Sequence, residues 1–313
     1  MFIDRLIEKI KEKNNPTVAG LDPKVDFIPE FILKQKFAEH GVSLKGAAEA
    51  IITFNKLIIE SIYDIVPAVK PQLAYYEMYG VEGIRAFKET IDYASEKGLI
   101  VISDGKRNDI GSTSEAYSNA FLGETVLDSE NSFPTFNSDA LTVNPYLGID
   151  GIKPFTDDCL KFGKGIFVLV KTSNPSSGQL QDLMLQDGNR VFESVADLVV
   201  EWGKPLIGKS GYSSVGAVVG ATWPSQAAEL RQRMPQSYFL VPGYGAQGGT
   251  SKDIAVNFNK DGLGAIINAS RSLMCAYKSD IWKNEFKETD FDKACRAEAI
   301  RMRDDINSAI GGL

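Results

Sequence analysis

The stretch LIVISDGKRNDI, residues 99–110, begins as a continuous apolar run and ends in a series of charged side chains. Its first part, residues 99–106, is rich in Ile, Leu and Val, which is typical of a parallel strand covered on both faces. Seven other short runs are similar: TVAGLD (17–22), PAVKPQL (67–73), DALTVNP (139–145), GIFVLVKTS (165–173), GAVVGAT (216–222), YFLVPGY (238–244) and GAIINAS (264–270). The sequence therefore predicts eight parallel strands.

Segments with the period of an α-helix separate most of these strands. Examples are AAEAIITFNKLIIESIYDI (47–65), GIRAFKETIDYASEKG (83–98), RVFESVADLVVEW (190–202) and SQAAELRQRM (225–234). Two further helices, over residues 3–13 and 291–310, are expected to close the two ends. Eight strand–helix units in series predict an α/β protein built as a (β/α)8 TIM barrel.

The chain length of 313 residues exceeds what the barrel itself requires. A (β/α)8 barrel takes about 250 residues, which leaves about sixty for terminal helices and extra loops. Two regions can hold these residues: 24–46 after the first predicted strand, and 174–214 after the fifth. Because no linker, low-complexity tract or repeat interrupts the strand–helix alternation, we expect a single domain over residues 1–313.

The charge balance limits the partners of this protein. There are 34 Lys and Arg residues against 41 Asp and Glu, a net charge of −7. Nucleic acids and anionic membranes attract clustered positive charge, so we expect neither as a partner. No apolar run approaches the ~20 residues of a membrane span, and the charged, amphipathic N-terminal segment does not resemble a secretory signal. The prediction is a cytoplasmic protein, in which a local basic site could still bind a small anion.

The cysteine and histidine content narrows the possible chemistry. Cys159, Cys275 and Cys295 lie far apart, so neither a zinc site nor a disulfide framework is expected. The single histidine, His40, excludes multi-histidine metal sites and most Ser-His and Cys-His mechanisms. Proton transfer must therefore use Lys, Asp, Glu or Tyr side chains.

Two glycine-rich segments match nucleotide-binding patterns, and we reject both as nucleotide motifs. GKPLIGKS (203–210) fits the phosphate-loop pattern, but a helical segment precedes it, a strand follows it, and Pro205 lacks an N–H donor. GYGAQG (243–248) fits the dinucleotide pattern, but it follows the seventh strand, whereas that fingerprint normally comes early. In a barrel, the loops after strands seven and eight often bind phosphate, and Arg271 supplies a suitable cation. The alternative is that these are turn glycines beside a solvated arginine.

Charged residues gather where the first three predicted strands end. Alternation along strand 99–106 places Asp104 and Lys106 on the same face, and Asp109 follows in the loop. Lys70 ends the second strand and Asp22 ends the first. A charge cluster in a loop is often only a solvated face, but active sites of such barrels lie at the carboxyl ends of the strands. We therefore expect an active site here.

The segment DGKRNDI, residues 104–110, is similar to the D-x-K-x-x-D signature of orotidine 5′-phosphate decarboxylases. LTVNPYLG, VVGATWP, LVPGYGAQGG and NASRS resemble the longer, type 2 bacterial branch of that family. The similarity runs from Gly20 to Arg271. It implies a carboxy-lyase that converts orotidine 5′-phosphate to uridine 5′-phosphate and CO2, the last step of pyrimidine nucleotide (UMP) biosynthesis.

The resemblance also implies the roles of individual residues. Lys106 would donate a proton to C6 of the pyrimidine, and Asp104 would lie against the substrate carboxylate. Lys70 and Asp109 would complete an alternating Lys-Asp-Lys-Asp array, and Asp109 would reach across a homodimer interface. The residues implied to bind substrate are Asp22 (ribose), Thr113 (from the partner subunit), Ser173 and Gln247 (pyrimidine edge), and Gly248 and Arg271 (phosphate).

A fixed lysine charge could drive this reaction without a metal or an organic cofactor. Two unit charges 4 Å apart interact by ~4 kcal/mol at an effective dielectric constant near 20, which is about three orders of magnitude in rate. Lys106 could therefore stabilise a carbanion at C6 before it gives up its proton.

Two alternatives remain at this stage. One is a magnesium-dependent sugar-phosphate decarboxylase or aldolase of the same superfamily, such as a keto-gulonate phosphate decarboxylase or a hexulose phosphate synthase. Those enzymes carry a carboxylate on the second strand, where this chain has Lys70. The other is a non-catalytic barrel that binds phosphosugars without turnover, which would have no need to place Asp104 against an anion.

Overall fold

Eight parallel strands close into a barrel in the computed structural model, which describes residues 1–245 and 249–312. Each strand pairs with its neighbours in the chain, and the last strand pairs back to the first. The strands are β1 (Thr17–Leu21), β2 (Ala68–Pro71), β3 (Ile100–Arg107), β6 (Ala140–Val143), β7 (Gly165–Lys171), β8 (Ser213–Val219), β9 (Ser237–Val241) and β10 (Ala265–Ala269). The predicted (β/α)8 barrel is confirmed, and all eight predicted strands are present.

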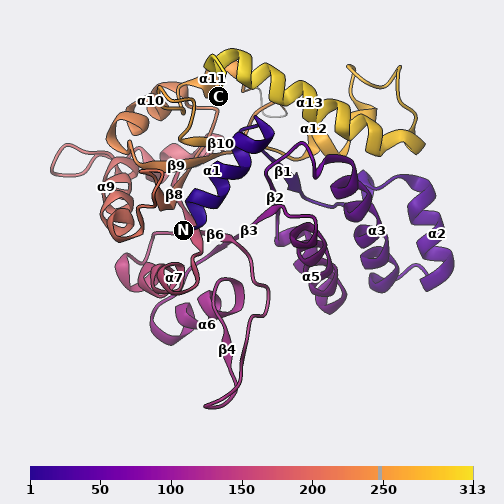
Figure 1. The fold of residues 1–313 in the computed structure, drawn as a ribbon, viewed down its shortest axis with the longest axis horizontal. Helices are drawn as coiled ribbons and strands as arrows, with labels where there is room; N and C mark the ends of the chain where they lie inside the picture. The colour runs from indigo at the N-terminus through magenta and orange to yellow at the C-terminus, as the bar shows by residue number, and fades with distance from the viewer. Residues whose placement is uncertain (246–248, 313) are drawn as a thin grey trace.

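Helices follow the strands and cover the outside of the barrel (Figure 1). The longer ones are α3 (Leu44–Ile62), α5 (Gly80–Glu96), α6 (Gly111–Phe121), α7 (Ile149–Phe162), α9 (Val191–Gly203), α10 (Pro224–Arg233) and α13 (Phe291–Ile310). Short helices are α4 (Ala74–Glu77), α8 (Gly178–Gln181), α11 (Ser251–Ala255) and α12 (Arg271–Met274). Single 3-10 turns span Val25–Phe27, Pro175–Ser177, Lys204–Leu206, Ala276–Lys278 and Glu288–Asp290. Among the helices of the described ranges, none is long and apolar enough to cross a membrane.

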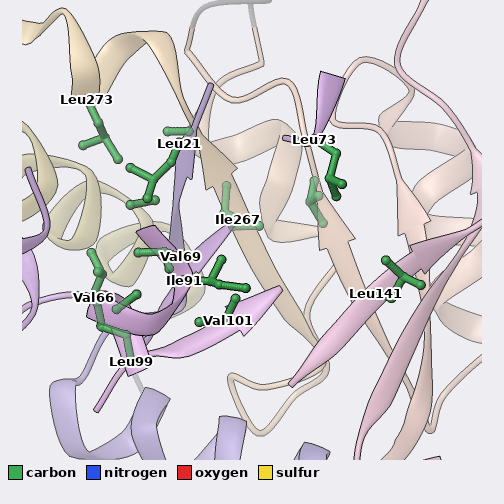
Figure 2. Packing of buried hydrophobic residues seen from close by; sticks show 14 of the residues in the cluster. Leu21, Val66, Val69, Leu73, Ile91, Leu99, Val101, Leu141, Ile267 and Leu273 are labelled. Atoms are coloured by element: carbon green, nitrogen blue, oxygen red, sulfur yellow. The ribbon is translucent and has the colours of Figure 1, made fainter. Parts of the chain in front are cut away.

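Strand alternation divides the buried apolar residues into two clusters. Outward-facing side chains such as Val69, Val101, Leu141 and Ile267 join the layer between strands and helices, part of which Figure 2 shows. Inward-facing residues fill the half of the barrel nearer the amino ends of the strands; they include Val18, Ala68, Ile100, Ile102, Ala140, Phe167, Leu240 and Ile266. The two sets alternate along each strand because successive side chains of a strand point to opposite faces.

Helix α1 (Phe2–Lys13) closes the amino-terminal end of the barrel. Its buried residues are Phe2, Ile3, Leu6, Ile7 and Ile10, a spacing that places them on one helix face. The ring of Phe2 packs edge-on against Phe167 of β7, with 6.0 Å between centroids. Figure 1 shows the helix lying across the strands. The predicted terminal helices over 3–13 and 291–310 are therefore both present, and the first packs on the barrel interior.

The two predicted insertions contain ordered structure. Region 24–46 contains the turn Val25–Phe27 and helix α2 (Glu30–His40), and region 174–214 contains α8 and α9. A third insertion was not predicted: a two-stranded hairpin of β4 (Thr125–Val126) and β5 (Ser132–Phe133), which projects from the barrel after α6 (Figure 1). All four of its strand residues are exposed, so it carries no pattern of burial that a sequence could reveal.

The segment GKPLIGKS does not have the strand–loop–helix arrangement of a nucleotide-binding phosphate loop. Gly203 ends α9, a 3-10 turn follows, and the chain then enters strand β8. The backbone N–H groups of Lys209 and Ser210 donate to the carboxylate of Asp4 at 3.2 and 2.9 Å. The amides that a phosphate would need are thus bonded to a side chain of α1, which confirms the rejection of this motif.

Replacement of Leu6 by Ala should destabilise the protein, because Leu6 is fully buried between α1 and the barrel interior. We expect the free energy of unfolding to fall by about 2–5 kcal/mol. Leu44→Ala is the matched control at an exposed position and should change it by less than about 0.5 kcal/mol. Urea unfolding measures both, and equal effects of the two substitutions would contradict the packing role of α1.

Candidate active site

The inward-facing rows of the strands change from apolar to polar toward their carboxyl ends. On β2, Ala68 is followed two residues later by Lys70, and on β3, Ile102 is followed by Asp104. The same change occurs on β6 between Ala140 and Thr142, and on β10 between Ile266 and Asn268. These polar side chains line a cavity of about 700 Å³. The alternation that places apolar side chains inside the barrel at the amino ends of the strands therefore also places the functional groups at their carboxyl ends.

Asp104 occupies the centre of this polar layer and accepts four hydrogen bonds. Its Oδ2 accepts from Lys70 Nζ at 2.7 Å and from Gln72 Nε2 at 2.8 Å. Its Oδ1 accepts from Lys106 Nζ at 2.6 Å and from Thr142 Oγ1 at 2.8 Å. Donors from β2, β3, β6 and the residue after β2 thus converge on one carboxylate, which restricts it to a single orientation.

Burial and charge together determine the ionisation of this group. The side chain of Lys70 is 5% exposed and that of Asp104 is 9% exposed, whereas that of Lys106 is 46% exposed. Burial alone would raise the pKa of Asp104, but the positive charges of Lys70 and Lys106 hold it well below its usual range. Burial alone would lower the pKa of Lys70, but Asp104 and Asp22 raise it above its ordinary value. At neutral pH Asp104 and Lys70 are therefore an anion and a cation at fixed positions.

Lys106 has an unusual backbone conformation. Its φ of 49° lies in the left-handed region, which side-chain-bearing residues rarely adopt. The pairing of β3 with β6 also shifts register between Ser103 and Arg107. The backbone N–H of Lys106 donates to Thr142 Oγ1 at 2.9 Å. This irregularity lets the half-exposed ammonium group face the cavity while it remains bonded to Asp104.

Asp22 and Asn268 present acceptors to the cavity from adjacent strands. Within the described ranges, Asp22 Oδ1 and Asn268 Oδ1 are buried and have no hydrogen-bond partner. Burial raises the pKa of Asp22, and the charge of Lys70 opposes that shift only in part. Buried acceptors are normally satisfied, so this pair suits a ligand that brings hydroxyl donors, such as a sugar.

Ser173 and Arg271, both predicted to contact substrate, line the same cavity. The carbonyl of Ser173 accepts from Thr222 Oγ1 at 3.0 Å, which attaches its loop to the one that follows β8. Arg271 is the first residue of α12, two positions after the end of β10, and its exposed side chain forms no ion pair with any described residue. A free guanidinium at this end of the barrel can receive an anion.

Gly243, in the glycine-rich segment after β9, lines the same cavity as Arg271. Gly243 and Gly245 have φ values of 106° and 70°, which glycine adopts without strain. The predicted residues Gln247 and Gly248 lie outside the described residues.

Asp109 and Thr113, by contrast, are not brought to the cavity of their own chain. Asp109 Oδ1 accepts from the backbone N–H of Ile110 at 2.7 Å, and Thr113 is exposed on α6. Neither residue lines the cavity that contains Lys106. Asp109 is half-buried, and the neighbouring Ile110 is exposed.

Gln72, Thr142 and Asn268 are among the polar residues of the cavity that sequence reasoning missed. A signal for each was present, since each shares its strand face with a residue already placed inward. Gln72 lies two residues after Lys70, and Thr142 and Asn268 occupy the last inward positions of their strands. Extending the two-residue alternation to every strand end would have found them.

The described residues contain no group of three or more His, Cys, Asp or Glu side chains arranged to hold a metal ion. At the position where the magnesium-dependent alternative needs a carboxylate, the cavity presents the ammonium group of Lys70. A second cation would be repelled from that position.

Comparison with known proteins identifies similar chains over the full length. Residues 53–279 match the family model described as Orotidine 5′-phosphate decarboxylase / HUMPS family. An orotidine 5′-phosphate decarboxylase of Caldicellulosiruptor bescii is 44% identical over 310 residues, covering 99% of each chain, and one of Clostridium tetani is 42% identical over 311 residues, again covering 99% of each. The structure of Leishmania donovani OMP decarboxylase has a TM-score of 0.73 at 29% identity and covers 99% of both chains.

Replacement of Lys70 by Met should leave Asp104 buried beside a single cation. Asp104 contributes stability above its ordinary pKa of about 3.9, which is lost as the pH falls through its lowered folded value. Lys70 contributes below about 10.4, and this is lost as the pH rises through its raised folded value. We expect a loss of about 3–5 kcal/mol near neutral pH. The loss should shrink in acid as Asp104 of the variant becomes protonated.

Urea unfolding of both proteins at neutral pH and near pH 4 measures this difference. Lys153→Met is the matched control, since Lys153 pairs with Asp157 on the surface of α7 and should matter little. A loss for Lys70→Met that equals the control, or that does not depend on pH, would contradict the charge assignment.

Proposed function

The chain belongs to the orotidine 5′-phosphate decarboxylase family and is a carboxy-lyase, and we propose that it decarboxylates orotidine 5′-phosphate with Lys106 as the proton donor. The observation that carries this proposal is the carboxylate of Asp104, held between the ammonium groups of Lys70 and Lys106 at the mouth of the barrel. The products are uridine 5′-phosphate and CO2, and the reaction belongs to pyrimidine nucleotide biosynthesis.

The reaction requires a bond to break without any electron-accepting group on the ring. The bond between C6 and the substrate carboxylate breaks, its electron pair stays on C6, and CO2 leaves. Lys106 stabilises the charge on C6 and then transfers a proton from Nζ to that carbon; the neutral amine regains its proton from solvent. Because Lys106 is already oriented by Asp104, no reorganisation is needed when the charge develops.

Asp104 has two effects in this mechanism. Its carboxylate holds the ammonium group of Lys106 in place before the reaction, since the two groups are 2.6 Å apart. The negative charge of Asp104 would also lie beside the substrate carboxylate. It repels that carboxylate in the bound substrate, and the repulsion falls in the transition state as neutral CO2 forms. Lys70 stabilises the buried carboxylate of Asp104, because its positive charge lies 2.7 Å from Oδ2.

The remaining contacts position the substrate. Asp22 would accept hydrogen bonds from the ribose hydroxyls, and its unsatisfied Oδ1 supports this role. Ser173 and Gln247 would bind the pyrimidine edge, and Arg271 with the backbone of Gly248 would bind the phosphate. Phosphate binding far from C6 supplies energy that can hold the reacting carbon against Lys106.

We further propose a homodimer in which Asp109 and Thr113 complete the site of the partner subunit. Neither residue lines the cavity of its own chain, and Thr113 is exposed while Asp109 is half-buried, which supports this arrangement. The proposal assigns residues 1–313 to one catalytic domain, because both terminal helices pack on the barrel. It places the enzyme in the cytoplasm, where its three free, buried cysteines would stay reduced.

A magnesium-dependent sugar-phosphate enzyme and a non-catalytic binding barrel are the competing functions. The buried ammonium group of Lys70 argues against a bound cation at the same place. Asp104 argues against simple binding, because a carboxylate directed toward an anionic ligand weakens affinity.

Lys106→Ala should reduce kcat for orotidine 5′-phosphate by about 1,000-fold or more, since the charge beside C6 and the proton are both lost. The loss of ultraviolet absorbance as substrate is consumed measures the rate. Wild-type activity should be insensitive to EDTA, and Lys45→Ala, at an exposed lysine of α3, is the control. Activity only on other sugar phosphates with added magnesium would favour the metal-dependent alternative, and binding without turnover would favour the non-catalytic one.

Mixing two inactive variants tests the shared site. A dimer of one Lys106→Ala subunit and one Asp109→Ala subunit has one site with both residues intact, if Asp109 acts across the interface. Random pairing of equal amounts should then restore about a quarter of the wild-type rate. Each variant alone stays inactive in this account. If co-refolded mixtures show no recovery although mixed dimers have formed, Asp109 does not serve the partner's site.

A further inference from the structure

A closed ring of hydrogen bonds begins and ends on Lys106. Its backbone N–H donates to Thr142 Oγ1 at 2.9 Å, and that hydroxyl donates to Asp104 Oδ1 at 2.8 Å. The same carboxylate oxygen accepts from Lys106 Nζ at 2.6 Å. One hydroxyl group and one carboxylate therefore connect the main chain of Lys106 to its own ammonium group.

The two ends of this ring are the parts of Lys106 that need restraint. The backbone has a φ of 49°, a conformation that is unfavourable for a residue with a side chain. The side chain is 46% exposed, and a lysine has a flexible four-carbon stem. Without outside contacts, neither the backbone nor the stem would hold the ammonium group in one direction.

The single Oγ1 atom of Thr142 bonds both to the backbone N–H of Lys106 and to Asp104 Oδ1, the oxygen that accepts from the ammonium group. Its side chain is buried, and three apolar residues, Leu169, Val218 and Leu240, line the cavity with it. An apolar side chain of the same shape would therefore fit at position 142. The hydroxyl is explained by its two hydrogen bonds.

We propose that Thr142 is a positioning residue, whose hydroxyl fixes the left-handed backbone of Lys106 and so directs the ammonium group toward the reacting carbon. The proposal rests on the assignment of Lys106 as proton donor. Orientation of a catalytic group affects the chemical step more than substrate binding, so loss of the hydroxyl should lower kcat and leave KM nearly unchanged.

The test compares Thr142→Val, which keeps the shape and removes the hydroxyl, with Thr142→Ser, which keeps the hydroxyl. For Thr142→Val we expect kcat for orotidine 5′-phosphate to fall by about tenfold to 100-fold and KM to change by less than about threefold. Thr142→Ser should retain kcat within about threefold. The control is Thr156→Val on α7, where the lost hydroxyl bonds only to the carbonyl of Lys153; its kcat should match wild type.

Each outcome of this test is decisive. A Thr142→Val enzyme with wild-type kcat, or one whose KM rises as much as kcat falls, would overturn the positioning role. If kcat of Thr142→Ser falls as far as that of Thr142→Val, the hydroxyl is not the relevant group. Thermal unfolding midpoints separate these results from misfolding, and Thr142→Ala replaces Thr142→Val if the latter does not fold. Failure of the proposed function is a different result: wild type would be inactive, or Lys106→Ala active.

Discussion

The ion pair between Asp104 and Lys70 is the interaction on which the rest of the site depends. A carboxylate with 9% exposure is stable in a barrel only if a cation and hydrogen-bond donors compensate it, and Lys70 with Gln72 and Thr142 does so. With Asp104 held in this way, one of its oxygens remains directed at Lys106. The carboxylate that repels the departing group is therefore also the one that orients the proton donor.

The barrel separates stability from function along its axis. Toward the amino ends of the strands, inward-facing residues are apolar and α1 covers them, so this half contributes buried surface. Toward the carboxyl ends, the same rows become polar and surround the cavity. The packed half at the amino ends supports the carboxyl ends of the strands, which must hold charged groups at fixed positions. An enzyme that stabilises a carbanion by fixed charge needs such support.

The sequence predicted the barrel because eight apolar runs alternated with helical segments, and it predicted Asp104, Lys106, Lys70 and Asp22 because they stood at strand ends. It did not predict what depends on three-dimensional detail. The register shift in β3 and the φ of Lys106 lie where β3 pairs with β6, and no local pattern in the sequence specifies that register. The contact between Thr142 and Asp104 spans 38 positions for the same reason. The placement of Asp109 outside its own cavity is expected only from the family resemblance, because no periodicity specifies the direction of the loop after β3.

The central claim is that Lys106 exchanges a proton with C6, and this can be measured apart from decarboxylation. In D2O, the enzyme should replace the C6 hydrogen of uridine 5′-phosphate by deuterium, because the protonation step runs in reverse at the same lysine. Proton NMR follows the loss of the C6 signal. The account predicts exchange with wild type and none above the buffer rate with Lys106→Ala. Equal exchange by both proteins would contradict it, since another group would then be the proton donor.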